Sequence, residues 1–148
     1  MAEKDHAALL NGIQRGWDEA MGLTYTKATL DEVKAEIVVG EVHVQQYGLV
    51  HGGVYAGMIE TICSAGAAMN AMARGQQGSV GLDNATSFLR AVREGTIRAT
   101  AKPLARGRRT QVWQADVRDG HGRLLATGRV RLMNLEKGDA PGGKEVEV

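Results

Sequence analysis

The order of apolar and polar positions divides the chain into a helical segment, two strands, a long apolar helix and four further strands. Residues 4–21 place apolar side chains near helical spacing with charges between them, which predicts a short amphipathic helix. From Leu23 the chain becomes strand-like, and residues 33–39 show the alternation of a half-buried strand after a turn at Asp31. The almost uniformly apolar run from Val54 to Ala73 predicts a buried helix.

Four alternating segments follow this helix, joined by short connections that favour antiparallel pairing. They cover residues 80–88, 97–102, 113–118 and 124–132. In the first of them, alternation predicts that five side chains share one side of the strand: Val80, Leu82, Asn84, Thr86 and Phe88. Residues 136–148 contain glycines, a proline and charges without periodicity, so we expect a flexible C-terminal tail after a single domain of residues 1–135.

A helix that is apolar on nearly all sides has to be covered on nearly all sides. One six-stranded sheet can curl around such a helix and leave its remaining surface to a second subunit. The pattern therefore predicts an α+β hotdog fold, with a six-stranded antiparallel sheet wrapped around a long central helix and an extra N-terminal helix.

Composition narrows the class of protein. The chain has 148 residues, 43% hydrophobic and 24% charged, as expected for one globular domain. A net charge of +1 excludes a generally basic nucleic-acid binder. Polar residues such as Glu60, Ser64 and Asn70 interrupt the apolar helix, which argues against a membrane span, and the charged residues 3–5 do not resemble a secretory leader. We expect a cytoplasmic protein that does not bind membranes.

The cysteine and histidine content offers no metal chemistry. Cys63 is the single cysteine, cannot form an intramolecular disulfide, and is interpreted as a small buried thiol without a catalytic role. One cysteine and four scattered histidines provide no zinc-ligand spacing, so no metal and no cofactor are predicted.

Glu60 is the most unusual residue, because a carboxylate in apolar surroundings is costly to bury without partners. Residues 45–53, followed by Glu60 and Ser64, resemble the active-site segment of hotdog-fold acyl-CoA thioesterases. The similarity is greatest to the branch with the Arthrobacter-type 4-hydroxybenzoyl-CoA thioesterase and the phenylacetate-pathway and menaquinone-pathway enzymes. It extends over roughly residues 20 to 133. His-Gly-Gly alone is weak, but a Glu nine residues after His51 in an apolar helix is more specific.

The residues themselves suggest thioester hydrolysis. Steps of three and four residues put Gly53, Gly57, Glu60 and Ser64 on one helical face, forming a groove through which an acyl group could approach the carboxylate. Backbone N–H groups at Gly52 and Gly53, with the helix dipole, could stabilise an oxyanion. Glu60 could then act as general base or as nucleophile. The alternative is a structural carboxylate, with the small-residue face serving as a helix–helix dimer contact.

The resemblance implies roles for individual residues. Gln45 would hold the thioester or the attacking water, His51 would orient the loop at the helix start, and the Gly52 N–H would face the carbonyl oxygen. Ser64 would position the water or the Glu60 carboxylate. In such enzymes the site lies between subunits of a homodimer, which often assembles to a homotetramer.

Substrate contacts are predicted for two further sets of residues. A basic surface for the polyanionic coenzyme A is expected at Arg90, Arg93, Arg106, Arg108 and Arg109. The alternative for each arginine is a solvated sheet edge. An aromatic or compact acyl group is expected against Tyr47, Gly53, Tyr55, Met58 and Phe88. The alternative for these side chains is ordinary core.

Two other functions stay open. A hotdog dehydratase or hydratase would need an Asp with a His in the helix region, and no Asp occurs between His51 and Ala73. A non-catalytic acyl-CoA-binding hotdog protein is the second alternative, because the same fold can bind without turnover.

Overall fold

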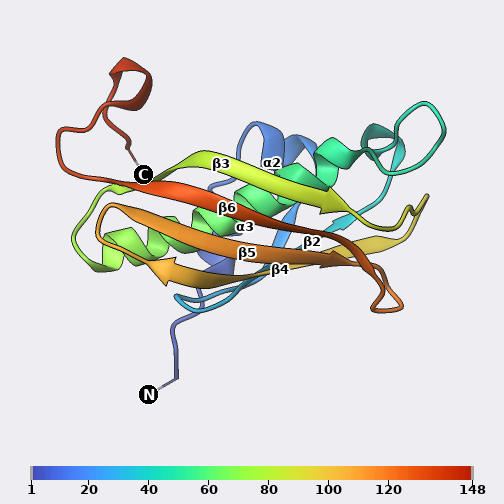
Figure 1. The fold of residues 1–148 in the computed structure, drawn as a ribbon, viewed down its shortest axis with the longest axis horizontal. Helices are drawn as coiled ribbons and strands as arrows, with labels where there is room; N and C mark the ends of the chain where they lie inside the picture. Colours follow the sequence, from blue (N-terminus) through green and yellow to red (C-terminus); the bar gives the residue numbers. More distant parts are fainter. Residues whose placement is uncertain (1, 148) are drawn as a thin grey trace.

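The computed structural model describes residues 2–147 and has one antiparallel sheet lying along the long helix α3, Gly52–Ala73 (Figure 1). The strands are β1 Thr24–Ala28, β2 Val33–Val38, β3 Gly78–Phe88, β4 Thr96–Arg106, β5 Thr110–Arg118 and β6 Leu124–Leu135. Their order across the sheet is β1-β2-β4-β5-β6-β3, and every pair is antiparallel. The predicted six-stranded antiparallel sheet with a long helix is confirmed.

The core lies between α3 and the sheet, because alternate side chains of the strands and one broad face of the helix are apolar. Ile59 and Ile62 of α3 and Trp113 of β5 are fully buried there. The indole of Trp113 packs onto Gly66, where a Cβ atom would lie 2.5 Å from the ring. A glycine at this position therefore brings the helix and the sheet close together.

The N-terminal segment differs from the single predicted helix. It contains two short helices, α1 Ala7–Gly12 and α2 Trp17–Ala20. Gly16 interrupts the helical path with a φ of 62°, which glycine adopts without steric cost. The segment packs on α3, where the Thr61 hydroxyl donates a 2.8 Å hydrogen bond to the carboxylate of Asp18.

Strand β3 contains an irregularity that changes which side chains face α3. The pairing with β6 shifts between Gly81 and Asp83, so Leu82 is an extra residue. Gly81 lies opposite the buried Leu132, and Asn84, Thr86 and Phe88 follow on that same side. The prediction that Val80 and Leu82 share a side with these three residues is wrong, because the bulge reverses the alternation.

The sheet has two edge strands, and two short 3-10 helices lie outside it. β1 and β3 are the outer strands of the sheet, and most of β3 is exposed. Two short 3-10 helices, η1 Glu41–His43 and η2 Pro141–Gly143, lie before α3 and after β6. The domain limits of 1–135 and 136–148 stay a prediction.

Candidate active site

The loop before α3 is held by its own side chains. The Gln45 carboxamide oxygen accepts hydrogen bonds from the backbone N–H groups of Tyr47 and Leu49. Arg93 donates a 2.6 Å hydrogen bond to the Tyr47 carbonyl. At the helix start, His51 Nδ1 accepts from the N–H of Gly53 at 2.8 Å, so His51 caps α3. The predicted location of His51 at the helix start is thus observed, and its ring is exposed.

A cavity of about 330 Å³ opens at the beginning of α3. It brings together five of the predicted site residues, Gln45, Gly52, Tyr55, Phe88 and Arg90. The Phe88 ring lies directly over Gly52, since a Cβ atom there would be 2.7 Å from the ring. Any larger residue at position 52 would therefore displace the aromatic wall of the cavity.

Further along α3, the Glu60 carboxylate is held by β3. Asn84 Nδ2 donates to Glu60 Oε2 at 3.0 Å and to the Ala56 carbonyl at 3.1 Å. The Thr86 hydroxyl donates to Asn84 Oδ1 at 2.6 Å, which directs the amide nitrogen towards the carboxylate. Gly81 leaves room on the other side, because a Cβ atom there would overlap Glu60 Oε1. The carboxylate is therefore oriented by β3 and half-buried.

The sequence pattern does not single out Asn84 or Gly81 as site residues. Asn84 lies within the part of the chain that carries the family resemblance, and this resemblance is its only signal in the sequence. The bulge between Gly81 and Asp83 determines that both residues face Glu60, and a periodic pattern does not reveal a bulge.

The amide donors and the carboxylate do not meet within one chain. Gly52 and Glu60 are eight residues apart on one helix, which corresponds to about 12 Å along its axis. A single thioester carbonyl cannot contact both. Ser64 lies one turn beyond Glu60, half-buried, and its carbonyl accepts a 3.3 Å hydrogen bond from Ser79.

Three other positions differ in what they can contact. Met58 is fully buried in the core, whereas the Tyr47 side chain is 70% exposed in the loop. The Gly53 N–H is already bonded to His51.

The expected open groove beside Gly57 is filled, because the indole of Trp17 occupies the space where a Cβ atom would lie. The prediction of a groove at Gly57 is therefore wrong, since α2 covers this part of the helix.

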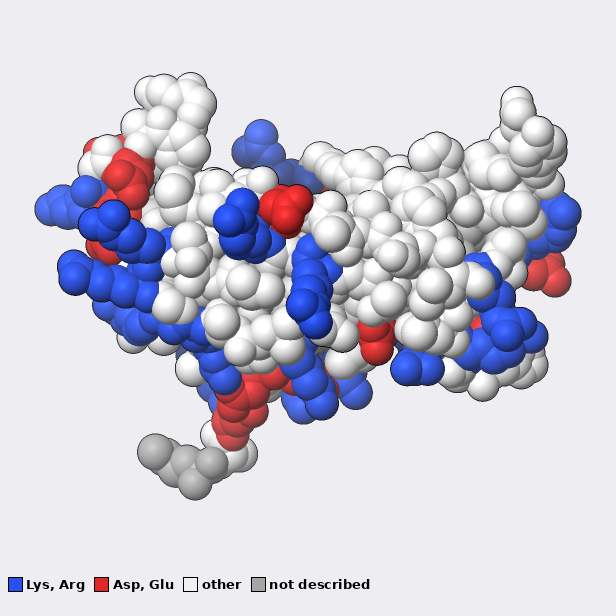
Figure 2. All heavy atoms as spheres, viewed as in Figure 1, with Lys and Arg blue, Asp and Glu red and all other residues white. Residues whose placement is uncertain are grey.

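The structure places the predicted arginines in three different settings. Arg90 lines the cavity at the start of α3. Arg108 and Arg109 lie in the β4–β5 hairpin beside a second cavity of about 470 Å³. Arg106 is engaged in its own chain, with a 2.7 Å ion pair to Asp31. Figure 2 shows Lys and Arg side chains gathered at the end of the molecule that this hairpin forms.

Buried polar groups hold that hairpin rigidly. Gln111, which is fully buried, donates to Asn134 Oδ1 at 2.8 Å and accepts from the Trp113 indole N–H at 2.9 Å. Asn134 in turn donates to the carbonyls of Gly107 and Arg108, at 3.1 and 2.8 Å. The backbone that carries the two hairpin arginines is therefore anchored to the core.

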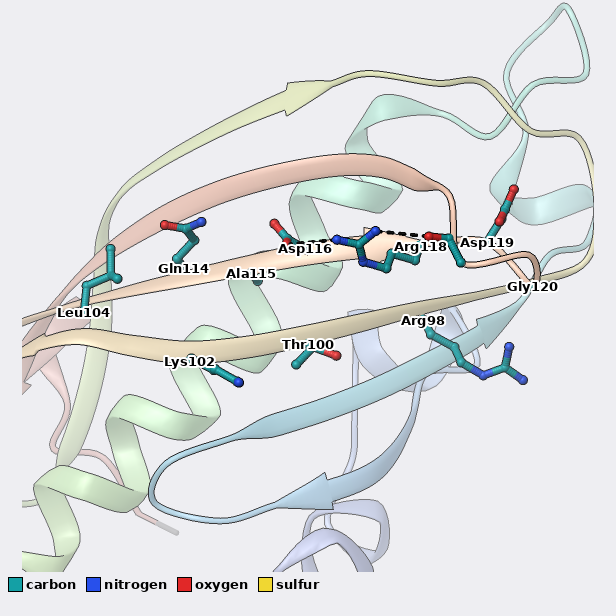
Figure 3. A pocket seen from close by; sticks show the side chains of 11 residues that line it. Arg98, Thr100, Lys102, Leu104, Gln114, Ala115, Asp116, Arg118, Asp119 and Gly120 are labelled. Carbon is teal, nitrogen blue, oxygen red and sulfur yellow. Dashed lines mark hydrogen bonds and ion pairs between the residues drawn. The ribbon is translucent and has the colours of Figure 1, made fainter.

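A basin of about 680 Å³ lies on the face of the sheet that points away from α3 (Figure 3). Charged and polar side chains of β4 and β5 line it, including Arg98, Lys102 and Asp116. The sheet separates this basin from Glu60 and Gly52. Among residues 2–147, no cluster of three His, Cys, Asp or Glu side chains could hold a metal ion, and no helix is long and apolar enough to cross a membrane.

A half-buried carboxylate on a sheet-wrapped helix, whose first turn offers the Gly52 N–H group, matches a known class. The sequence profile of the thioesterase superfamily matches residues 47–126, and the chain belongs to this family of hotdog-fold thioester hydrolases. A Mycobacterium tuberculosis protein named as an esterase, Rv1847, is 42% identical over 121 residues, covering 81% of this chain and 86% of the mycobacterial one. Its solved structure superposes with a TM-score of 0.80 at 40% identity, covering 83% of this chain and 98% of that chain.

Two further relatives have more specific names. The proofreading thioesterase EntH of Cronobacter sakazakii is 34% identical, covering 76% of this chain and 80% of that protein. The 1,4-dihydroxy-2-naphthoyl-CoA hydrolase of Escherichia coli is 36% identical, covering 68% of this chain and 72% of that protein.

Proposed function

We propose that the protein is an acyl-CoA thioesterase that hydrolyses a compact or aromatic acyl-CoA to the free acid and coenzyme A. The observation that carries this proposal is the Glu60 carboxylate, which Asn84 holds beside the space left by Gly81. A carboxylate oriented in this way is suited to attack or to activate water, on a helix whose first turn supplies oxyanion donors.

The working enzyme is a homodimer in this proposal, and the dimers pair to a homotetramer. The separation of Gly52 and Glu60 along one helix supports it, because a second chain can bring its own helix start to the carboxylate. The exposed edge of β3 and the half-exposed face of α3 around Ser64 are the surfaces available for this contact. Each site would then combine Glu60 and Ser64 of one protomer with Gln45, His51 and Gly52 of its partner.

In the proposed reaction, the Gly52 N–H and the positive end of the α3 dipole stabilise the oxyanion that forms on the thioester carbonyl. Glu60 either takes a proton from the attacking water, after which the tetrahedral intermediate expels the coenzyme A thiolate, or attacks the carbonyl itself. In the second route the thiolate leaves as the anhydride forms, and water then opens the anhydride to the free acid and the Glu60 carboxylate. Gln45 holds the thioester or the water, and Ser64 positions the water or the carboxylate. His51 keeps the first turn of the helix in place through its bond to the Gly53 N–H.

Coenzyme A phosphates are proposed to bind Arg90, Arg108 and Arg109, whose guanidinium groups offer paired donors to phosphate oxygens. Arg106 is not proposed for this role, because Asp31 and the Asn70 side chain already engage its guanidinium group.

A compact acyl group fits the cavity of about 330 Å³ beside Gly52. The E. coli relative, named for its action on a dihydroxynaphthoyl thioester, supports an aromatic substrate. Tyr55 and Phe88 form the aromatic wall, with ring centroids 6.1 Å apart.

The test is a panel of acyl-CoA thioesters with a thiol-trapping readout, run on wild type and on Glu60→Gln. We expect CoA release from wild type and a loss of about 10²–10⁴-fold in kcat in the variant, the range for a general base. Glu36→Gln, on the opposite face of the sheet, is the matched control and should retain full turnover. Wild-type binding of acyl-CoA without thiol release would support the non-catalytic binding protein instead, and unchanged turnover in Glu60→Gln would refute the mechanism.

A further inference from the structure

The hydroxyl of Tyr55 is a buried polar group without a partner. Tyr55 is 2% exposed, and its hydroxyl has no hydrogen-bond partner within the part of the chain that the structure describes. An unpaired buried hydroxyl destabilises a fold by about 1–3 kcal/mol, so native proteins contain few of them. Phenylalanine would fill the same space without this cost. Packing alone therefore does not explain why the side chain at position 55 carries a hydroxyl.

The surroundings of Tyr55 indicate where a partner would come from. Tyr55 lines the cavity at the start of α3, one turn after Gly52. Most of the remaining lining is apolar, with Leu49, Val50, Phe88, Leu89 and Ala91. Such a cavity suits a ligand with an apolar body and few polar atoms.

Two other polar side chains line the cavity, Gln45 and Arg90. The Gln45 carboxamide oxygen accepts from two backbone N–H groups of its own loop. Phe88, 56% exposed, covers Gly52 and faces Tyr55 with its ring tilted by 39°. The Tyr55 hydroxyl itself has no surface open to the cavity, so a ligand reaches it only when the exposed Phe88 ring shifts.

The hydroxyl is available as a donor over the whole neutral range. Desolvation by burial, together with the negative charge of Asp119, raises the pKa of Tyr55 above its ordinary value. A protonated phenol both donates and accepts a hydrogen bond.

We infer that Tyr55 is a specificity-determining residue whose hydroxyl binds a polar atom, such as a hydroxyl, on an otherwise apolar compact acyl group. The inference rests on the proposed function, because it takes the cavity beside Gly52 as the acyl site. Acyl groups with such an atom gain a hydrogen bond at a hydroxyl that is shielded from water, and those without it leave the Tyr55 hydroxyl unpaired.

The experiment measures kcat/KM for two matched pairs of thioesters, 4-hydroxybenzoyl-CoA against benzoyl-CoA and 3-hydroxybutyryl-CoA against butyryl-CoA. Wild type should prefer the hydroxylated member of at least one pair, and the pair shows whether the polar atom lies on an aromatic or an aliphatic group. In Tyr55→Phe this preference should fall by about tenfold, corresponding to one buried hydrogen bond. Tyr25→Phe is the matched control, since Tyr25 is also buried but lies in β1, and it should keep the wild-type preference.

Thermal unfolding of the same variants separates recognition from packing. Tyr55→Phe should unfold at a higher temperature than wild type without ligand, because an unpaired polar group has been removed. The inference is overturned if both substrate preferences are the same in wild type and Tyr55→Phe. Absence of CoA release from every thioester by wild type would instead refute the proposed function.

Discussion

Replacing Gly81 by alanine tests whether β3 orients the catalytic carboxylate. The Cβ atom would overlap Glu60 Oε1 and lie 3.3 Å from its carboxyl carbon. The backbone of Gly81 is not in the left-handed region, so alanine itself is unstrained. The side chain that has to move is therefore Glu60, away from the amide of Asn84.

The size of the effect follows from this geometry. The carboxylate has to withdraw by roughly 1 Å, and a misplacement of that size costs on the order of 10²-fold in rate. The 3.0 Å hydrogen bond from Asn84 would lengthen at the same time. Stability should change little, since alanine lowers the conformational entropy of the unfolded chain relative to glycine.

The assay is steady-state CoA release by Gly81→Ala, with a thermal melt to show that the variant is folded. Gly120→Ala is the matched control, because a Cβ atom at Gly120 meets nothing within 4 Å. In the Glu60→Gln background, Gly81→Ala should cost almost nothing further, because both changes act on one group. A folded Gly81→Ala enzyme with wild-type kcat, or an undiminished effect in the Glu60→Gln background, would refute the reasoning.

Three more predictions concern packing, charge and pH. Gly66→Ala places a methyl group 2.5 Å from the Trp113 ring and should cost about 1–3 kcal/mol by overpacking, measured by urea unfolding; an unchanged midpoint would contradict the close helix–sheet contact. Arg108→Ala combined with Arg109→Ala should raise KM for acyl-CoA at low salt and leave kcat nearly unchanged, with the difference from wild type shrinking as salt is added; a salt-independent KM would exclude the phosphate role. Desolvation opposes ionisation of Asp119, but N–H groups of Arg123 and His121 outweigh it and hold its pKa below the ordinary value. The charged form is thus favoured in the folded state, so its stabilisation is present at neutral pH and lost as pH falls through the folded-state pKa; Asp119→Asn should flatten the acid limb of a Tm–pH profile, and identical profiles would contradict this.

The local pattern of apolar and polar residues was sufficient to predict α3 and the strands of the sheet, but not the division of the N-terminal segment into two short helices. The period of the apolar positions located α3 and its neighbouring strands within a few residues, because a helix and a half-buried strand repeat their buried positions with different periods. The motif from Gln45 to Ser64 indicated thioester chemistry, because the residue types needed for it lie close together in the chain.

Only the tertiary structure decided which side chains meet. The bulge at Leu82 brings Asn84 and Gly81 to Glu60, and the indole of Trp17 fills the space beside Gly57. These contacts join segments far apart in sequence, so they depend on strand register and on packing between elements, which the local period does not contain. The sequence by itself therefore determined the helix, the strands and the kind of chemistry, whereas long-range packing determined how the carboxylate is held.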